Sequence, residues 1–194
     1  ALAAVSNDPM GKAFSDATFD INHKSVITLA TKAKAAGVRK FIFASSCSVY
    51  GEGGDLAKTE EDSVQPLTDY AQSKIMSEMA LASLASDTFS VVCLRFATAC
   101  GVSDRTRLDL VLNDFVWEYT VSGKIKILSD GSPLRPLIDV ADMSRALCWA
   151  VDFEPKENFL VLNCGYNEAN FSVMEIAKKV SNGIIGKGFV GTAV

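Results

Sequence analysis

The residues with the clearest capacity for chemistry are Tyr70 and Lys74, in the segment Asp69-Tyr-Ala-Gln-Ser-Lys74. On a helix, residues four positions apart share a face at a separation of about 6 Å, so the phenol and the ammonium would point the same way. A nearby ammonium favours the phenolate and lowers the pKa of a tyrosine from about 10 towards neutral pH. The spacing therefore indicates Tyr70 as a general acid/base that takes a proton from a hydroxyl while hydride leaves the adjoining carbon.

A strand and a helix must position this pair. The apolar run Val38–Ala44 is typical of a buried strand, and it ends in Ser45-Ser46. A polar, glycine-rich loop at 51–68 follows, and then a predicted helix from about Asp69 to Ala85. A tyrosine and a lysine also fall at this spacing by chance, and the position at the start of a helix after such a strand is what gives the pair weight.

Helical and strand patterns alternate along the rest of the chain. The remaining helices are predicted at 18–36, 108–121, 140–153 and 172–181, and the remaining strands at 90–97, 124–128 and 159–163. Gly37 is a good terminator for the first helix, and Ser172 is a good N-cap for the last. Such alternation predicts an α/β fold with a largely parallel sheet.

The composition limits the partners and the kinds of site that can be expected of this chain. The 194 residues carry a net charge of −4, which argues against nucleic acid, and no apolar run is long enough for a membrane span. His23 is the only histidine, so neither a histidine-based metal site nor a Ser-His-Asp triad is expected. Five cysteines without Cys-x-x-Cys spacing predict free thiols in a reducing cytoplasm: Cys47, Cys93, Cys100, Cys148 and Cys164.

Several motifs, in a consistent order, carry a resemblance to a known family. Ser46-Cys-Ser-Val-Tyr-Gly51 and Tyr70-x-x-x-Lys74 resemble the extended short-chain dehydrogenase/reductase superfamily, in its NAD-dependent epimerase/dehydratase group acting on nucleotide sugars. Further similar motifs extend the resemblance to about residue 180: Leu94-Arg-Phe-Ala-Thr-Ala-Cys-Gly101, Arg135-Pro-Leu-Ile-Asp-Val-Ala-Asp142, Leu162-Asn-Cys-Gly165 and Phe171-Ser-Val-Met-Glu-Ile-Ala177.

The resemblance implies a Rossmann-like doubly wound parallel sheet that lacks its first strands, with a smaller substrate-binding lobe. Residues 1–101 would be the remainder of the NAD-binding domain with the catalytic residues. Residues 102–182 would be mostly the substrate-binding lobe, interleaved with the last Rossmann elements, and 183–194 a tail of uncertain origin. A homodimer through the Tyr70 helix and its neighbour is also implied.

The resemblance further implies a role for individual residues. Ser46 would hydrogen-bond the reacting oxygen, Tyr70 would be the acid/base, and Lys74 would grip the nicotinamide ribose and tune Tyr70. Ser45 and Ser48 are the rival serines, for which a structural role is expected. The implied cofactor contacts are Leu2, Ala3, Ala4, Asn22, Tyr70 and Lys74, and the implied substrate contacts are Ser46, Thr98, Asn113 and Arg135.

The substrate contacts have alternatives. Arg135 suits a diphosphate because a guanidinium binds phosphate oxygens through two parallel hydrogen bonds, although a surface ion pair would also use it. Asn113 fits a polar residue on a helix surface nearly as well. Thr98 stands where the family usually has Asn, which weakens the expected contact there. Cys47 and Ser48 follow Ser46 where the dehydratases place acidic residues, which favours epimerisation or carbonyl reduction over dehydration.

The last glycines, Gly186-Lys-Gly-Phe-Val-Gly191, form the only G-x-G-x-x-G of the sequence. A dinucleotide-binding turn needs a helix after it, and three residues remain. A severed start of another nucleotide-binding domain with a strand at Asn182–Ile185, a circular permutation and a chance match stay open.

In the family that this chain resembles, the glycine-rich loop that binds the pyrophosphate precedes the point where this sequence begins. We therefore expect the chain alone to bind NAD weakly or not at all, with NADP as an alternative cofactor. The leading function is a nucleotide-sugar epimerase or reductase in the cytoplasm. The alternative is a non-catalytic fragment or binding module that retains the fold.

Overall fold

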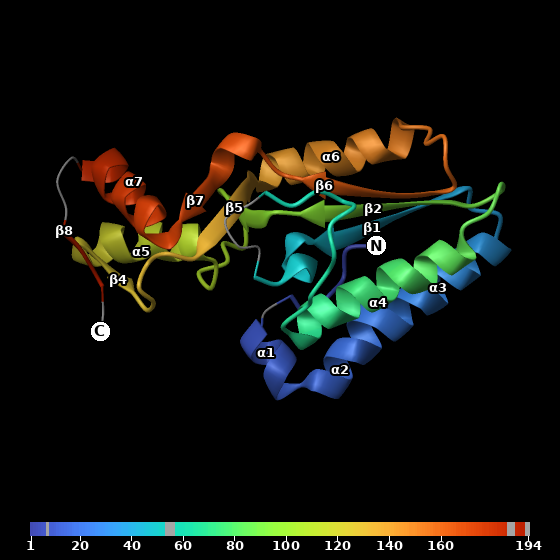
Figure 1. Ribbon diagram of the computed structural model, residues 1–194, viewed down its shortest axis with the longest axis horizontal. Coiled ribbons are helices and arrows are strands. Elements are labelled where there is room, and N and C mark those ends of the chain that lie inside the picture. Colours follow the sequence, from blue (N-terminus) through green and yellow to red (C-terminus); the bar gives the residue numbers. More distant parts are fainter. Residues whose placement is uncertain (7, 53–56, 186–188, 193–194) are drawn as a thin grey trace. The chain divides into compact units, whose positions relative to one another are not determined.

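The computed structural model describes residues 1–6, 8–52, 57–185 and 189–192, which form two compact units (Figure 1). The first unit consists of Ala1–Phe96 and Ser144–Cys164, and the second of Ala97–Met143 and Gly165–Val194. Helices and strands alternate along the chain, and the predicted α/β fold with a parallel sheet is confirmed.

A parallel sheet of three strands forms the centre of the first unit. Its strands are β1 (Lys40–Ser46), β2 (Ser90–Phe96) and β6 (Phe159–Cys164), in the order β1-β2-β6. Ser46 is paired with Phe96, which is paired with Cys164, so the three strands end at the same edge of the sheet. The middle strand β2 is an almost continuous apolar run, as expected for a strand covered on both faces.

Helices cover both faces of this sheet. Helices α3 (Ser25–Ala35) and α4 (Asp69–Leu84) lie side by side on one face, and α6 (Val140–Asp152) lies along the other (Figure 1). The predicted helix at 18–36 is helical, but it begins earlier and is interrupted: α1 (Asp8–Ala13) and α2 (Ser15–Phe19) precede a π-helical turn at Asp20–Lys24. No helix in the described ranges is long and apolar enough to cross a membrane.

The core of the first unit lies between β1, β2 and the helices α3 and α4. Phe41 and Phe43 of β1 are buried on the same side because strand side chains alternate. They pack in one apolar cluster with side chains from α3, α4, β2 and the residue before β2: Val26, Ala30, Leu81, Phe89, Val91 and Cys93. Small buried residues on α4, namely Ala71, Ser73 and Ser77, leave room for close approach of the neighbouring elements.

The second unit contains short strands and two helices. Its strands are β3 (Thr98–Cys100), β4 (Lys124–Ile127), β5 (Leu134–Asp139), β7 (Asn170–Ser172) and β8 (Phe189–Thr192). β3 pairs parallel with β5, β5 antiparallel with β7, and β4 parallel with β8. Helices α5 (Val111–Ser122) and α7 (Val173–Ile185) pack on an apolar core that includes Phe115, Ile127 and Ile176.

Helix α7 corrects one sequence hypothesis. A capping box starts it, in which Ser172 Oγ accepts from Glu175 N at 3.1 Å and Ser172 N donates to Glu175 Oε2 at 2.8 Å. From this start the helix continues through Ile185, so the strand hypothesised at Asn182–Ile185 is wrong. The first glycines of the G-x-G-x-x-G, at 186–188, lie outside the described residues.

The turn after β1 depends on Gly51. A short 3-10 helix at Cys47–Tyr50 follows the strand, and Gly51 then adopts a φ of +69°. A Cβ at this position would stand 2.1 Å from the carbonyl oxygen of Gln65, whose N–H is bonded to Val49. Both the conformation and the space therefore require glycine.

We predict that Gly51→Ala lowers the free energy of unfolding by about 2–4 kcal/mol, because backbone strain and a backbone clash add. Gly37→Ala is the matched control, since Gly37 has a φ of +80° and nothing within 4 Å of a Cβ. It should cost about 1 kcal/mol, from the conformation alone. Urea unfolding measures both, and equal losses would contradict the role given to the Gln65 carbonyl.

Candidate active site

Tyr70 and Lys74 lie on one face of α4, at its amino-terminal end. Thr68 caps the helix, with its Oγ1 accepting from Ala71 N at 3.2 Å, so Tyr70 falls in the first turn. The Nζ of Lys74 lies 5.5 Å from the centroid of the Tyr70 ring. The two side chains are thus adjacent, as the four-residue spacing predicts.

Lys74 is a buried ammonium. Its side chain is 4% exposed, and its Nζ donates to the carbonyl oxygen of Ala44 at 2.8 Å, near the end of β1. Nζ also lies 4.8 Å from the centroid of the Phe43 ring. Burial lowers the pKa of Lys74 to about 8, although the negative charge of Glu78 opposes this effect.

The described residues do not use all the hydrogen-bond donors of Lys74. An ammonium carries three N–H donors. Among the described residues, the Ala44 carbonyl is the one acceptor that Nζ contacts. The remaining donors suit an oxygen of a bound molecule, such as a ribose hydroxyl, because an unbonded N–H of a buried cation is costly.

The three serines around the end of β1 have different partners. Ser45 donates to Glu78 Oε1 on α4 at 2.5 Å and is buried. Ser46, the last residue of the strand, accepts from the N–H and the hydroxyl of Ser48, at 3.2 and 3.0 Å. Within the described part of the chain no acceptor is recorded for the Ser46 hydroxyl, which leaves its proton for another oxygen.

Asn22 holds the first residues of the chain in place. Its side-chain amide forms two hydrogen bonds with the backbone of Val5, at 2.7 and 2.9 Å, and a third with Ser73 Oγ of α4, at 3.1 Å. Ser73 in turn donates to the carbonyl of Tyr70 at 2.7 Å. The fully buried Asn22 thus joins α4 to the segment that contains Leu2–Ala4.

That segment begins beside β1. The backbone of Ala1 bonds both Ile42 O and Ala44 N, which extends the parallel sheet past β1 by one residue. The expected cofactor contacts Leu2, Ala3 and Ala4 follow directly, and Leu2 and Ala3 are exposed. Their contact with a cofactor stays a prediction.

The expected substrate contacts Thr98, Asn113 and Arg135 all lie in the second unit. Thr98 opens β3 and is paired with Leu137, and Asn113 on α5 donates to the carbonyl of Arg107 at 3.1 Å. Arg135 in β5 is exposed, and its Nη1 donates to the Leu134 carbonyl at 2.8 Å. Arg135 therefore retains guanidinium donors for an anion, and the substrate contacts stay predictions.

Sequence reasoning missed a buried polar network next to Lys74. It consists of Glu78 on α4, Arg95 on β2, Tyr50 at the end of the 3-10 helix, and Asn163 on β6. The signal that could have revealed it is a charged residue inside the apolar run Ser90–Phe96, because such a charge requires a buried partner.

Metal ligands and disulfides play no visible part in this site. Over the described ranges, no three His, Cys, Asp or Glu side chains gather as metal ligands would. The five cysteines are free thiols, as the sequence indicates.

Comparison with known proteins identifies the family. The family model described as "NAD dependent epimerase/dehydratase family" matches residues 1–165. The chain belongs to the NAD-dependent epimerase/dehydratase family. Of the motifs that carry the resemblance, those from Ser46 to Gly165 fall within this match, and Phe171–Ala177 lies beyond it.

Curated relatives of this epimerase/dehydratase family include UDP-glucose 4-epimerases. That of Lactobacillus helveticus is 26% identical over 181 residues, which cover 84% of this chain and 55% of the relative. That of Neisseria meningitidis serogroup C is 29% identical over 183 residues, which cover 82% of this chain and 52% of the relative. The chain therefore spans about half the length of the curated relatives it matches.

A solved structure shows the same fold. MoeE5, in complex with UDP-glucose and NAD, has a TM-score of 0.86 and 27% identity, with 99% of this chain and 64% of that chain covered. The epimerase/dehydratase fold is thus shared over almost all of this chain.

The burial of Lys74 gives a pH-dependent stability that can be measured. A lysine whose pKa is lower in the folded than in the unfolded state binds fewer protons when folded, so stability rises with pH between the two values. We predict that wild type gains up to about 3 kcal/mol relative to Lys74→Met between pH 8 and 10.5. Denaturant unfolding across this range measures it.

Lys126→Met is the control, because Lys126 is an exposed lysine of the second unit. Its stability should follow that of wild type throughout. If the free energy of unfolding changes with pH in the same way in wild type and Lys74→Met, the pKa of Lys74 is not lowered by folding.

Proposed function

We propose that this chain supplies the catalytic residues of an NAD-dependent epimerase or reductase that acts on a nucleotide sugar. The observation that carries the proposal is the Lys74 ammonium, which is buried beside the Tyr70 ring and bonds one acceptor among the described residues. Membership of the family and the similarity to UDP-glucose 4-epimerases support this function.

The residues present fit NAD as cofactor. Lys74 would donate its remaining N–H groups to the nicotinamide ribose, and the segment Leu2–Ala4 would run along the cofactor. Bound NAD would supply the hydride acceptor and, in the return step, the hydride donor. Tyr70 would lie beside the same ribose because it shares a helix face with Lys74.

The proton chemistry belongs to Tyr70 and Ser46. The Tyr70 phenolate accepts the proton of a sugar hydroxyl as the C–H bond releases its electron pair with the hydrogen, which leaves a carbonyl. Ser46 donates a hydrogen bond from its hydroxyl to that oxygen and holds it in place. Return of the hydride to the opposite face of the carbonyl and of the proton from Tyr70 inverts the carbon centre.

Epimerisation or carbonyl reduction is favoured over dehydration. Elimination of water needs an acid to protonate the departing hydroxyl. Cys47 and Ser48 follow Ser46 in the 3-10 helix, and neither is such an acid. Arg135 would bind the diphosphate of the nucleotide sugar through its free guanidinium donors. Thr98 and Asn113 would contact the same substrate.

The assay compares wild type with Tyr70→Phe, in the longest form of the protein that can be produced, with UDP-glucose and UDP-galactose as probes. We predict that the variant loses at least about 100-fold in kcat, because general acid/base catalysis contributes 10²–10⁴-fold. Binding of NADH, followed by fluorescence transfer, should persist. Tyr166→Phe is the control, since Tyr166 bonds Asp142 in the second unit.

Unchanged turnover in Tyr70→Phe would refute the role of Tyr70. A wild-type protein that folds and binds NADH but turns over neither sugar would favour the non-catalytic module. Turnover of UDP-glucose with NAD consumed in stoichiometric amounts would indicate a dehydrogenase instead of an epimerase.

We also propose a homodimer through α3 and α4. Their solvent-facing sides carry Leu29, Met76 and Met79, with exposed fractions of 53%, 37% and 68%. Burial of such side chains against a second copy would be favourable. Met79→Glu should convert a dimer to a monomer in sedimentation velocity, whereas Leu128→Glu in the second unit should not. A wild-type monomer at all concentrations would contradict the proposal.

A further inference from the structure

A chain of hydrogen bonds, buried at its centre, crosses the first unit behind the candidate catalytic residues. We propose that Glu78 and Tyr50 are positioning residues, which fix the strand end and turn that carry Ser46 relative to the helix that carries Tyr70 and Lys74. The inference rests on the proposed function and adds residues to it that do not touch substrate or cofactor.

The centre of the chain is an ion pair between α4 and β2. Glu78 and Arg95 are 3% and 6% exposed, and Arg95 Nη2 lies 2.6 Å from Glu78 Oε2. Arg95 Nε donates to both carboxylate oxygens, at 3.0 and 3.2 Å. Three contacts between one guanidinium and one carboxylate leave little rotational freedom, so the pair fixes α4 against the middle strand of the sheet.

The first branch of the chain reaches the strand that carries Ser46. Ser45 donates to Glu78 Oε1 at 2.5 Å. Because adjacent side chains of a strand point to opposite faces, fixing Ser45 towards α4 directs Ser46 to the other face. Glu78 thus determines on which side of the strand end the Ser46 hydroxyl lies.

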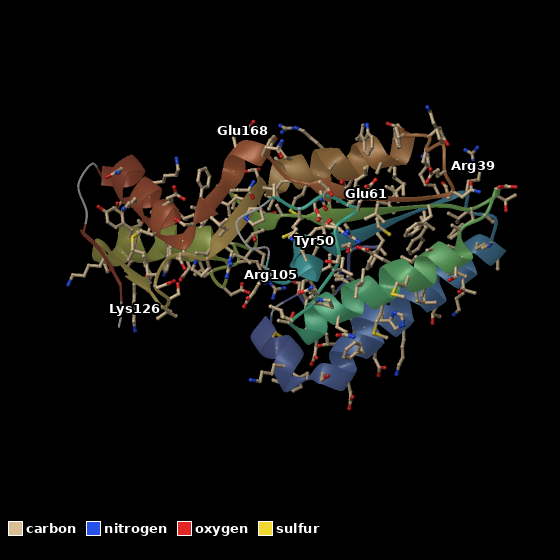
Figure 2. All side chains as sticks on the ribbon, viewed as in Figure 1. Arg39, Tyr50, Glu61, Arg105, Lys126 and Glu168 are labelled. Atoms are coloured by element: carbon tan, nitrogen blue, oxygen red, sulfur yellow. The ribbon has the colours of Figure 1, made fainter. Side chains whose placement is uncertain are left out.

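The second branch reaches the turn after that strand. Arg95 Nη1 donates to Tyr50 Oη at 2.8 Å, and its guanidinium carbon lies 5.0 Å from the centroid of the Tyr50 ring. Tyr50 is the last residue of the 3-10 helix that Ser46 caps (Figure 2). Ser46 therefore sits between two anchored residues, Ser45 before it and Tyr50 after it.

The chain continues to the third strand and to the loop beyond the turn. Tyr50 Oη donates to Asn163 Oδ1 at 2.7 Å. Asn163 in turn donates through Nδ2 to the Lys58 carbonyl at 3.1 Å and through its N–H to Glu60 Oε1 at 2.7 Å. One hydroxyl of Tyr50 thus joins the ion pair to β6 and to the loop before α4.

Electrostatics connect the same network to Lys74. Glu78 follows Lys74 by one helical turn, and its charge raises the pKa of Lys74 against the effect of burial. Burial opposes the charge of Arg95, yet the hydrogen bonds with Glu78 and Tyr50 hold the pKa of Arg95 above its ordinary value. Glu78 therefore lies close to two buried cations, Lys74 and Arg95.

Stability alone does not account for such a network. A buried ion pair contributes little compared with apolar residues of the same volume, because both charges lose their hydration. Its benefit is a single arrangement of the groups it joins. Here those groups are the strand end, the turn and the helix that carry Ser46, Tyr70 and Lys74.

The sharpest test is Tyr50→Phe, which removes one hydroxyl and keeps the ring. Its matched control is Tyr119→Phe, at a tyrosine that is 3% exposed in the second unit, against 6% for Tyr50. We expect Tyr50→Phe to lower kcat about 10- to 100-fold, measured in the same form of the protein as Tyr70→Phe. The KM for the nucleotide sugar should stay within about twofold of the wild-type value. Tyr119→Phe should leave both unchanged.

A second measurement does not depend on turnover. Lysine labelled with 13C at Cε reports the titration of Lys74 by NMR, with Lys74→Met to assign the signal. We expect Glu78→Gln to lower the midpoint of Lys74 by about one pH unit, because an opposite charge nearby shifts a pKa by roughly that much. Ser45→Ala, which keeps the charge of Glu78, should leave the midpoint in place but lower kcat.

The outcomes separate the two proposals. If wild type shows no turnover, the proposed function fails while the titration still tests the coupling of Glu78 to Lys74. If Tyr50→Phe and Ser45→Ala both retain wild-type kcat in a protein that turns over, the positioning roles are refuted. Equal losses of kcat in Tyr50→Phe and Tyr119→Phe would also refute them, because the effect would then be general destabilisation.

Discussion

The hydrogen bond from the buried Lys74 ammonium to the carbonyl of Ala44 is the contact on which the site depends. It joins the first turns of α4 to the end of β1, and these are the two places where the candidate catalytic residues lie. The bond requires the helix to lie close to the strand. The small residues Ala71, Ser73 and Ser77 on the buried side of α4 make that approach possible.

The parallel sheet brings further residues of the site to the same place as this contact. Because β1, β2 and β6 end at the same edge, the residues that follow each strand meet there. Alternation along β1 then separates the two serines: Ser45 is directed to Glu78 on α4, and the Ser46 hydroxyl has no acceptor among the described residues. Asn22 bonds the backbone of Val5, and these bonds hold the segment after Ala1 at the same edge.

Much of this could be predicted from the sequence, and the reasons are local. Tyr70 and Lys74 were recognised because i and i+4 share a helix face whatever the helix packs on. The alternation of elements gave the α/β fold, and Gly37 and Ser172 marked helix ends through their own backbone chemistry. The short strands β3, β5 and β7 were missed because three to six residues of mixed polarity carry no clear period.

The partners of buried polar groups could not be predicted for a different reason. Glu78 and Arg95 are 17 positions apart in the sequence, and their pairing follows only once α4 is packed on β2. Asn22, in the π-helical turn Asp20–Lys24, likewise bonds the backbone of Val5, 17 positions earlier in the sequence. Sequence shows that a buried charge needs a partner, but tertiary packing decides which one it is.

Three buried charged residues lie near the end of β1, namely Lys74, Glu78 and Arg95, and they differ in how well the protein compensates their desolvation. Arg95 compensates Glu78 through three contacts, so that pair is satisfied within the protein. Among the described residues, Lys74 contacts one carbonyl oxygen and two aromatic rings, which is poor compensation for a desolvated ammonium. Arg95 bonds a carboxylate of opposite charge, whereas Lys74 bonds one carbonyl among the described residues, so the greater desolvation cost falls on Lys74. Such a cost is expected where a ligand completes the site, because oxygens of the ligand can then accept the remaining hydrogen bonds of Lys74.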